Sequence, residues 1–250
     1  MKLTKLLSIA ALGLILSANS FAVETQIMVR AKAVDAKYIG TSVGGVKIIV
    51  EDAETGEMLD TGWINGGTGS TKALIKEPIK RGQVLTDTDT AGFVAKVDIS
   101  SPRLIRIKLV GPYGYRQALQ EASVTTWVIP GKDIMGDGIT LNMSGFIVDS
   151  WTRVLEGGKL EIYTKAALLC GCPIYPDGPW DPKNYEATAI LMKDEVKVGE
   201  ITLDFTGPVG MFSGKTVIKE AGYYKAIVYL FDKTTGNVGV DRTMFEINLD

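Results

Sequence analysis

Two cysteines, Cys170 and Cys172, lie on either side of Gly171 and are the only cysteines in the chain. Two thiols at this spacing can bond to each other, bond to other partners, stay reduced, or bind a soft metal. A disulfide needs Cα atoms roughly 4.4–6.8 Å apart, and an extended three-residue span lies near the upper limit. A bridge therefore needs a bent backbone, which Gly171 permits because it has no Cβ. We expect a local disulfide between these cysteines.

Two other uses of the cysteine pair stay open. One is thiol redox exchange, because a strained small-ring disulfide is more easily reduced. The other is binding of Cu(I), with Met192 and Met211 as added thioether ligands if the fold brings them close; otherwise these two methionines fill gaps in the core. The chain has 0 histidines, which excludes blue-copper sites and the common catalytic zinc sites.

Aromatic residues follow the cysteine pair in a proline-rich stretch, 173–182, that carries Tyr175 and Trp180. Together with Trp151 they are candidate platforms on which sugar rings stack. The alternative is that these rings cover a junction between domains. We carry both interpretations forward.

Residues 1–22 read as a secretory signal peptide. Lys2 and Lys5 form its positive end, Leu6–Leu16 its apolar segment, and Ser20–Ala22 a cleavage site with small residues at the two positions that matter. Cleavage after Ala22 predicts a periplasmic or secreted protein in an oxidising compartment, which favours an oxidised cysteine pair. No later stretch is long and apolar enough to cross a membrane.

The charge balance also bears on partners. Removing the signal peptide takes away two lysines and leaves 25 basic and 29 acidic residues. No basic patch stands out in this slightly acidic chain. We therefore expect no nucleic-acid partner.

The rest of the chain alternates between apolar and polar residues with a period of two, the signature of half-buried strands, and shows no helical period. Short strands separated by Gly, Asp and Pro turns indicate tandem antiparallel β-sandwiches. We predict a first domain over 23–148, a linker over 149–157 and a second, immunoglobulin-like domain over 158–250. The predicted strands are 26–34, 43–52, 58–64, 94–99, 104–110, 118–127 and 139–148 in the first domain, and 159–169, 185–192, 196–205, 212–219, 222–232 and 243–249 in the second.

Each half resembles a known family. Val46–Glu57 ("VKIIVEDAETGE") and Val84–Val97 ("VLTDTDTAGFVAKV") resemble the carboxypeptidase regulatory-like, transthyretin-type β-sandwich family. That resemblance implies an accessory or binding role and transfers no catalytic residue. Ala221–Gly239 ("AGYYKAIVYLFDKTTGNVG") resembles the penultimate hairpin of bacterial immunoglobulin-like modules, with Tyr223 or Tyr224 in the place of a tyrosine corner.

Two pairs of carboxylates are candidates for metal binding or acid–base chemistry. Asp87 and Asp89 resemble part of a calcium loop but lack the EF-hand spacing and its closing Glu. Asp133 and Asp137 are the one pair to consider for acid–base work, but no sequence feature separates their pKa values. For both pairs we favour a structural role in turns.

These observations predict a non-enzymatic, secreted or periplasmic protein without a cofactor. No nucleophile–base or phosphate-binding motif is present. We expect the protein to bind other envelope or extracellular macromolecules or to take part in an envelope assembly. The alternatives are a thiol-redox or Cu(I)-binding protein acting through Cys170 and Cys172, and a polysaccharide-binding protein acting through Tyr175, Trp180 and Trp151.

Overall fold

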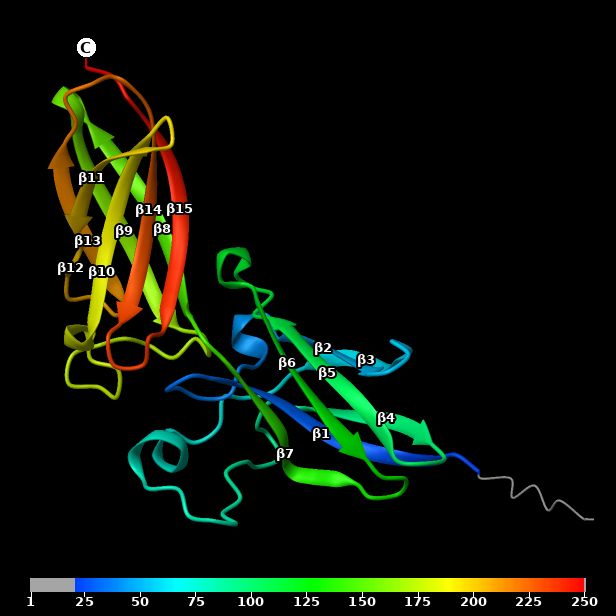
Figure 1. The fold of residues 1–250 in the computed structure, drawn as a ribbon. Coiled ribbons are helices and arrows are strands. Elements are labelled where there is room, and N and C mark those ends of the chain that lie inside the picture. Colours follow the sequence, from blue (N-terminus) through cyan, green and yellow to red (C-terminus); the bar gives the residue numbers. More distant parts are fainter. Residues whose placement is uncertain (1–20, 250) are drawn as a thin grey trace, which may run out of the picture.

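The computed structural model describes residues 21–249 and shows two β-sandwiches joined end to end in an L-shaped molecule (Figure 1). This confirms the predicted all-β fold of tandem sandwiches. Nearly all of the predicted signal peptide lies outside the described residues. The strands are β1 (Val23–Ala33), β2 (Val46–Asp52), β3 (Met58–Ile64), β4 (Phe93–Ile99), β5 (Arg103–Gly111), β6 (Gln120–Val128), β7 (Ile134–Met143), β8 (Phe146–Leu155), β9 (Lys159–Leu168), β10 (Tyr185–Lys193), β11 (Val196–Thr202), β12 (Asp204–Phe205), β13 (Met211–Val217), β14 (Gly222–Asp232) and β15 (Val238–Ile247).

The first sandwich packs the sheet β4-β1-β7 against the sheet β3-β2-β5-β6. Its central strands alternate as the sequence predicts: in β2 the positions Val46, Ile48 and Val50 are fully buried, and the residues between them are not. One departure from the expected antiparallel pairing is the β1–β7 pair, which is parallel. A parallel pair needs a long crossover, and here the whole remainder of the sandwich supplies it.

The second sandwich has the strand order of an immunoglobulin domain. One sheet runs β12-β13-β9-β8 and the other β11-β10-β14-β15, which corresponds to the immunoglobulin orders D-E-B-A and C′-C-F-G. The expected tyrosine corner is Tyr224 at the start of β14: its side chain is buried, and its hydroxyl donates to the carbonyl of Glu220 at 2.8 Å. Tyr223 is exposed instead.

The predicted linker over 149–157 is wrong. Residues 149–155 belong to β8, which pairs with β9 along its whole length, and Gly157-Gly158 form the turn between these strands with φ near 69°. The chain leaves the first sandwich earlier, at Ser144-Gly145, and so divides the strand predicted over 139–148 between β7 and β8. The second half of β8 lies at a sheet edge and is largely exposed, so it lacks the apolar–polar alternation of a half-buried strand.

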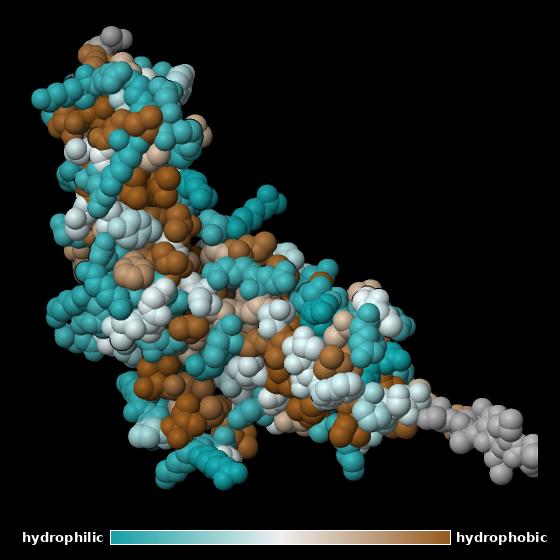
Figure 2. All heavy atoms as spheres, in the orientation of Figure 1, coloured by the Kyte–Doolittle hydropathy of each residue, from teal (hydrophilic) through white to brown (hydrophobic). Residues whose placement is uncertain are grey.

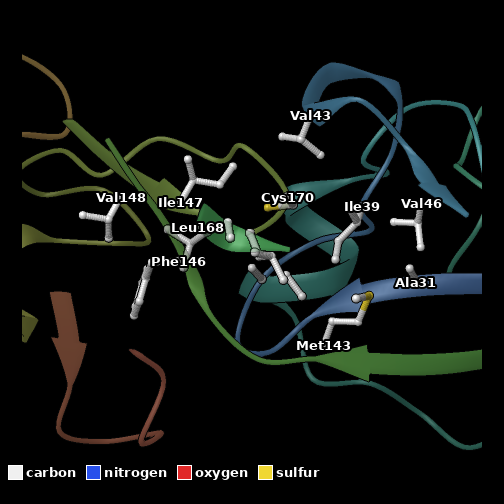
Figure 3. Close-up of a cluster of buried hydrophobic side chains, with 14 of the residues drawn as sticks. Ala31, Ile39, Val43, Val46, Met143, Phe146, Ile147, Val148, Leu168 and Cys170 are labelled. Atoms are coloured by element: carbon white, nitrogen blue, oxygen red, sulfur yellow. The ribbon is translucent and has the colours of Figure 1, made fainter. Parts of the chain in front are cut away.

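The hydrophobic cores of the two sandwiches meet at their junction. The buried apolar residues form one contiguous cluster that includes both sandwiches. Figure 3 shows the contact region, with Val43, Ile39 and Met143 of the first sandwich opposite Ile147, Leu168 and Cys170 of the second. The junction is therefore a packed interface.

Candidate functional site

The cysteine pair lies at the end of β9, where a tight reversal ends the strand. β9 is the second strand of its sandwich, whereas we predicted the first. The amide of Gly171 donates to the carbonyl of Leu168 at 2.7 Å, and the amide of Leu168 donates to the carbonyl of Cys172 at 3.0 Å. Beyond this reversal Pro173, which has no amide hydrogen to donate, makes only an isolated bridge to Ala167.

Within that reversal the two cysteines form a disulfide, with Cα atoms 5.4 Å apart. Both are buried, at 1% and 4% exposure. Gly171 projects between them toward the first sandwich with φ of 78°, and a Cβ there would come within 2.9 Å of a Val43 methyl carbon. Glycine is therefore required for both its backbone conformation and its close contact with the short helix η1 (Thr41–Val43).

Trp180 anchors the proline-rich stretch to the first sandwich. Its indole is 3% exposed, and its Nε1–H donates to the carbonyl of Asp35 at 2.8 Å. The amide of Tyr175 donates to the carbonyl of Trp180 at 3.1 Å, which closes the stretch on itself. Because the ring is enclosed, Trp180 has no face to offer to a sugar; it covers the domain junction, which was our alternative interpretation.

Asn237, in the turn between β14 and β15, bridges the junction a second time. Its side-chain oxygen accepts from the amide of Gly145 at 2.6 Å, and its side-chain nitrogen donates to the carbonyl of Val34 at 3.3 Å. The amide side chain supplies the acceptor oxygen and the donor nitrogen that these two bonds need. Asn237 is 2% exposed, so both bonds are shielded from water.

A pocket of about 270 Å³ opens beside the disulfide, between the sandwiches. It contains one amine, Lys37, whose Nζ donates to the carbonyl of Gly69 at 3.3 Å and whose pKa is lowered by burial. No carboxylate lines it. The lining residues are Lys37, Ser42, Thr68 and Thr71 from the first sandwich and Cys170, Gly171, Cys172, Pro173, Tyr175, Pro179 and Trp180 from the second.

Charged groups at the junction have shifted pKa values. Burial, together with the nearby charge of Asp232, raises the pKa of Asp35. Burial lowers the pKa of Lys32, against the opposing attraction of Asp35. Tyr185 lies at the same junction, and burial followed by repulsion from Asp232 and Asp35 raises its pKa well above the ordinary value. The junction thus disfavours charge on these side chains.

This arrangement does not assemble the metal site that the sequence left open. The cysteine sulfurs are bonded to each other, and among residues 21–249 no group of three or more His, Cys, Asp or Glu side chains is placed to hold a metal ion. Met192 lies seven residues along β10 from Tyr185, which is about 23 Å of strand. Tyr185 is the β10 residue nearest the junction, where its ring contacts Phe146. Met192 is therefore remote from the cysteines.

The three aromatic residues predicted as stacking platforms do not form one surface. Tyr175 lies at the rim of the junction pocket, Trp180 is enclosed, and Trp151 lies on β8 at 42% exposure. Trp151 stacks instead on Tyr163 of β9, with ring centroids 5.7 Å apart and planes at 12°. Tyr163 was not among the predicted site residues, although the register of β8 and β9 places it directly opposite Trp151 on the same face.

The Trp151–Tyr163 pair lies between two rows of charges on the outer face of the β8–β9–β13 sheet. On one side the register aligns Arg153, Glu161 and Lys215, where Glu161 pairs with Lys215 at 2.7 Å. Tyr163 donates its hydroxyl to Glu161 at 2.7 Å. On the other side Asp149 lies opposite Lys165. We refer to this surface as the aromatic face.

Three of the carboxylates considered from the sequence, Asp137, Asp133 and Asp87, bind backbone or hydroxyl groups of the first sandwich. Asp137 accepts hydrogen bonds from the amides of Leu85 and Thr86 and from the Thr86 hydroxyl. Burial acts to raise the pKa of Asp137, but these hydrogen bonds prevail and hold it below the ordinary value. Asp133 instead accepts from the amide of Gln26. Asp87 caps its own turn by accepting from the Thr90 hydroxyl at 2.6 Å.

Comparison with known proteins gives no family. No protein-family model matches the chain, and no curated protein matches it. Among solved structures, the chain is similar to a DUF3823 family protein from Bacteroides ovatus, at 12% identity over 90% of this chain and 100% of that chain, with a TM-score of 0.33. It is also similar to the chicken interferon gamma receptor alpha chain, at 8% identity over 92% and 98%, with a TM-score of 0.32. Scores this low add nothing to the sandwich assignment, which rests on strand pairing. None of the helices among the described residues is long and apolar enough to span a membrane.

Proposed function

We propose that this chain is a non-enzymatic binding protein that works outside the cytoplasm, in the periplasm or after secretion, and recognises another envelope or extracellular protein. The signal peptide predicted over 1–22 supports the location, and β1 begins at Val23, directly after the predicted cleavage site. A local disulfide suits the oxidising compartment. The first sandwich is proposed to be of the carboxypeptidase regulatory-like type, with Asp52 accepting from the amides of Glu54 and Thr55 in its characteristic turn.

The aromatic face carries this proposal. Trp, Tyr and Arg are the residues that contribute most to binding at protein interfaces, and this face gathers Trp151, Tyr163 and Arg153 on adjacent strands. None of these side chains is needed for the core, because the opposite face of β9 provides Leu160 and Ile162. The packed junction supports the same role, since it holds this face in a fixed orientation to the first sandwich.

A photo-crosslinking amino acid at Ser213, opposite Tyr163 in the register, tests the proposal in the native compartment. We expect one defined protein adduct from position 213 that disappears in Trp151→Ala. A crosslinker at Thr125 on the first sandwich is the control for surface collisions, and Trp127→Ala is the matched tryptophan control, with 59% exposure. Equal adducts from positions 213 and 125, or adducts that survive Trp151→Ala, would refute the proposal.

A second candidate function is polysaccharide binding, which the same ring pair favours because sugar rings pack on exposed aromatic faces. It is narrower than the sequence predicted, since only Trp151 of the three residues lies on this face. Retardation in gels that contain an envelope polysaccharide, abolished by Trp151→Ala and not by Trp127→Ala, would favour it over protein binding.

The thiol-redox and Cu(I) alternatives lose support. Exchange requires access of a thiolate to a disulfide sulfur, and the two cysteines are 1% and 4% exposed. The junction pocket beside them has one amine and several hydroxyls but no carboxylate, so no acid–base pair lines it.

A further inference from the structure

The connection between β3 and β4, residues 65–92, is unusually long for a sandwich. Its one regular element is the short turn of π-helix η2 (Lys72–Lys76). Connections longer than about 12–15 residues without structure of their own are uncommon and often functional. Figure 1 shows this connection below the junction of the two sandwiches.

Two anchors hold the connection to the first sandwich. At one, Leu74 is 6% exposed, and Ile75 packs beside it against the core. At the other, the amides of Leu85 and Thr86 donate to Asp137 at 3.0 Å. Residues 76–84 lie between the anchors and are mostly exposed. We call this segment the basic loop.

The basic loop concentrates positive charge on an acidic protein. The stretch 72–81 has four cations, Lys72, Lys76, Lys80 and Arg81, against one carboxylate, Glu77, in a chain whose net charge is −2. Glu77 pairs with Lys72 at 3.3 Å. The other three side chains are exposed and make no ion pair with any residue in 21–249. These exposed cations form a basic patch, so the expectation that the chain has none is wrong.

Exposed apolar side chains flank these cations. The amide of Gln83 donates to the carbonyl of Lys80 at 3.1 Å, with Gly82 at φ of 77°, so the chain reverses over 80–83. On either side of this turn are Ile79, at 57% exposure, and Val84, at 67%. Figure 2 shows hydrophilic side chains projecting at the bottom of the molecule beside hydrophobic surface, where this connection lies.

We propose that the basic loop docks on the surface of an anionic lipid bilayer, with Lys76, Lys80 and Arg81 at the phosphate headgroups and Ile79 and Val84 in the headgroup–acyl boundary. An open hollow of about 700 Å³ gives a headgroup room to enter the turn. Its lining residues are Glu77, Pro78, Lys80, Arg81, Gly82 and Gln83. Basic and apolar residues side by side are the composition of segments that lie at membrane interfaces.

The apolar pair distinguishes a bilayer from a soluble anionic polymer. A polymer neutralises Lys and Arg equally well, but it has no apolar layer in which Ile79 and Val84 could be buried. A bilayer binds both the basic and the apolar side chains. Each basic side chain near the surface strengthens binding roughly five-fold. Binding of the headgroups also weakens with salt, because the Debye length falls from about 10 Å at 0.1 M to about 3 Å at 1 M.

Vesicle co-sedimentation tests this with a chain that begins at Val23, which keeps every described strand. We expect binding to vesicles of equal parts phosphatidylglycerol and phosphatidylcholine and none to phosphatidylcholine alone. The triple variant Lys76→Gln, Lys80→Gln, Arg81→Gln should weaken binding about 100-fold. Ile79→Ser should weaken it about ten-fold with every charge retained.

A matched triple variant controls for net charge. Lys132→Gln, Lys159→Gln, Lys219→Gln removes the same charge from exposed lysines elsewhere and should bind like the original chain. The proposal is overturned if the original chain does not bind the anionic vesicles, or if the two triple variants weaken binding equally. It is also overturned if Ile79→Ser binds as well as the original, which would show that charge alone, without burial of apolar side chains, holds the loop at an anionic surface.

Discussion

Asn237→Ala should release the junction between the sandwiches. The substitution removes the bond to the Val34 carbonyl, worth about 1 kcal/mol. It also leaves the buried amide of Gly145 without an acceptor, at a cost of about 1–3 kcal/mol. The expected loss is therefore about 2–4 kcal/mol in the free energy of unfolding. The backbone of the turn is kept, because the carbonyl of Asn237 still accepts from the amide of Asp232.

Guanidinium-induced unfolding followed by tryptophan fluorescence measures this loss, since Trp180 lies at the junction. Small-angle scattering of the folded variant should also show a wider distribution of shapes, because one of the junction's hydrogen-bonded links is gone. Asn184→Ala, at an exposed asparagine, is the matched control and should change stability by less than about 0.5 kcal/mol. If Asn237→Ala lowers the free energy of unfolding by no more than this control does, the bridging role of Asn237 is wrong.

Three further predictions concern single features. Replacing Cys170 and Cys172 together by Ala should leave the protein folded and lower its free energy of unfolding by about 1.6 kcal/mol, because the bridge closes a three-residue loop in the unfolded chain. Thermal or chemical unfolding measures this loss. Failure to fold would show that the bridge sets the shape of the reversal. Arg30→Met should lower the free energy of unfolding by at least about 3 kcal/mol. The buried guanidinium donates to the carbonyls of Thr90, Ala91 and Gly136, and these would lose their donor. A loss under about 1 kcal/mol in chemical unfolding would contradict this. Asp35→Asn should raise the unfolding midpoint at pH 7 and change it little at about pH 3. The reason is that a folded-state pKa raised by burial penalises the ionised carboxylate, and this penalty is absent below the unfolded pKa of about 3.9. The gain should stay below about 1 kcal/mol because solvent screens the group, and a lower midpoint at pH 7 would count against the raised pKa.

Local pattern predicted most of the strands because their cause is local. In β14 the buried side chains recur at every second residue, and the strand begins and ends where the sequence predicts. The tyrosine corner is also local, since the Tyr224 hydroxyl reaches a carbonyl only four residues upstream. The pattern failed at β8, because an edge strand with both faces partly exposed lacks the apolar–polar alternation of a half-buried strand.

Only the locally determined part of the candidate site, the disulfide, was predicted from the sequence. The approach of Cys170 to Cys172 depends on one glycine between them, so the sequence favoured a disulfide. The roles of the aromatic residues depend on what lies opposite them in space. Trp180 is enclosed because the proline-rich stretch packs against the first sandwich, where the carbonyl of Asp35, 145 residues away in sequence, accepts from its indole. Trp151 is exposed and paired because β9 places Tyr163 beside it.

By itself, then, the sequence determined the elements whose energetics are settled within a few residues: alternating strands, Asp–Gly turns and the bend at Gly171. Tertiary structure alone decided where one sandwich ends and the next begins, since a strand's partner defines its domain. It also decided that Asn237 bridges the sandwiches and that Lys76, Lys80 and Arg81 make no ion pair with any residue in 21–249. Contacts between residues distant in the chain are stabilised by burial and by partners that the fold brings together. No local sequence pattern specifies which residues those partners are.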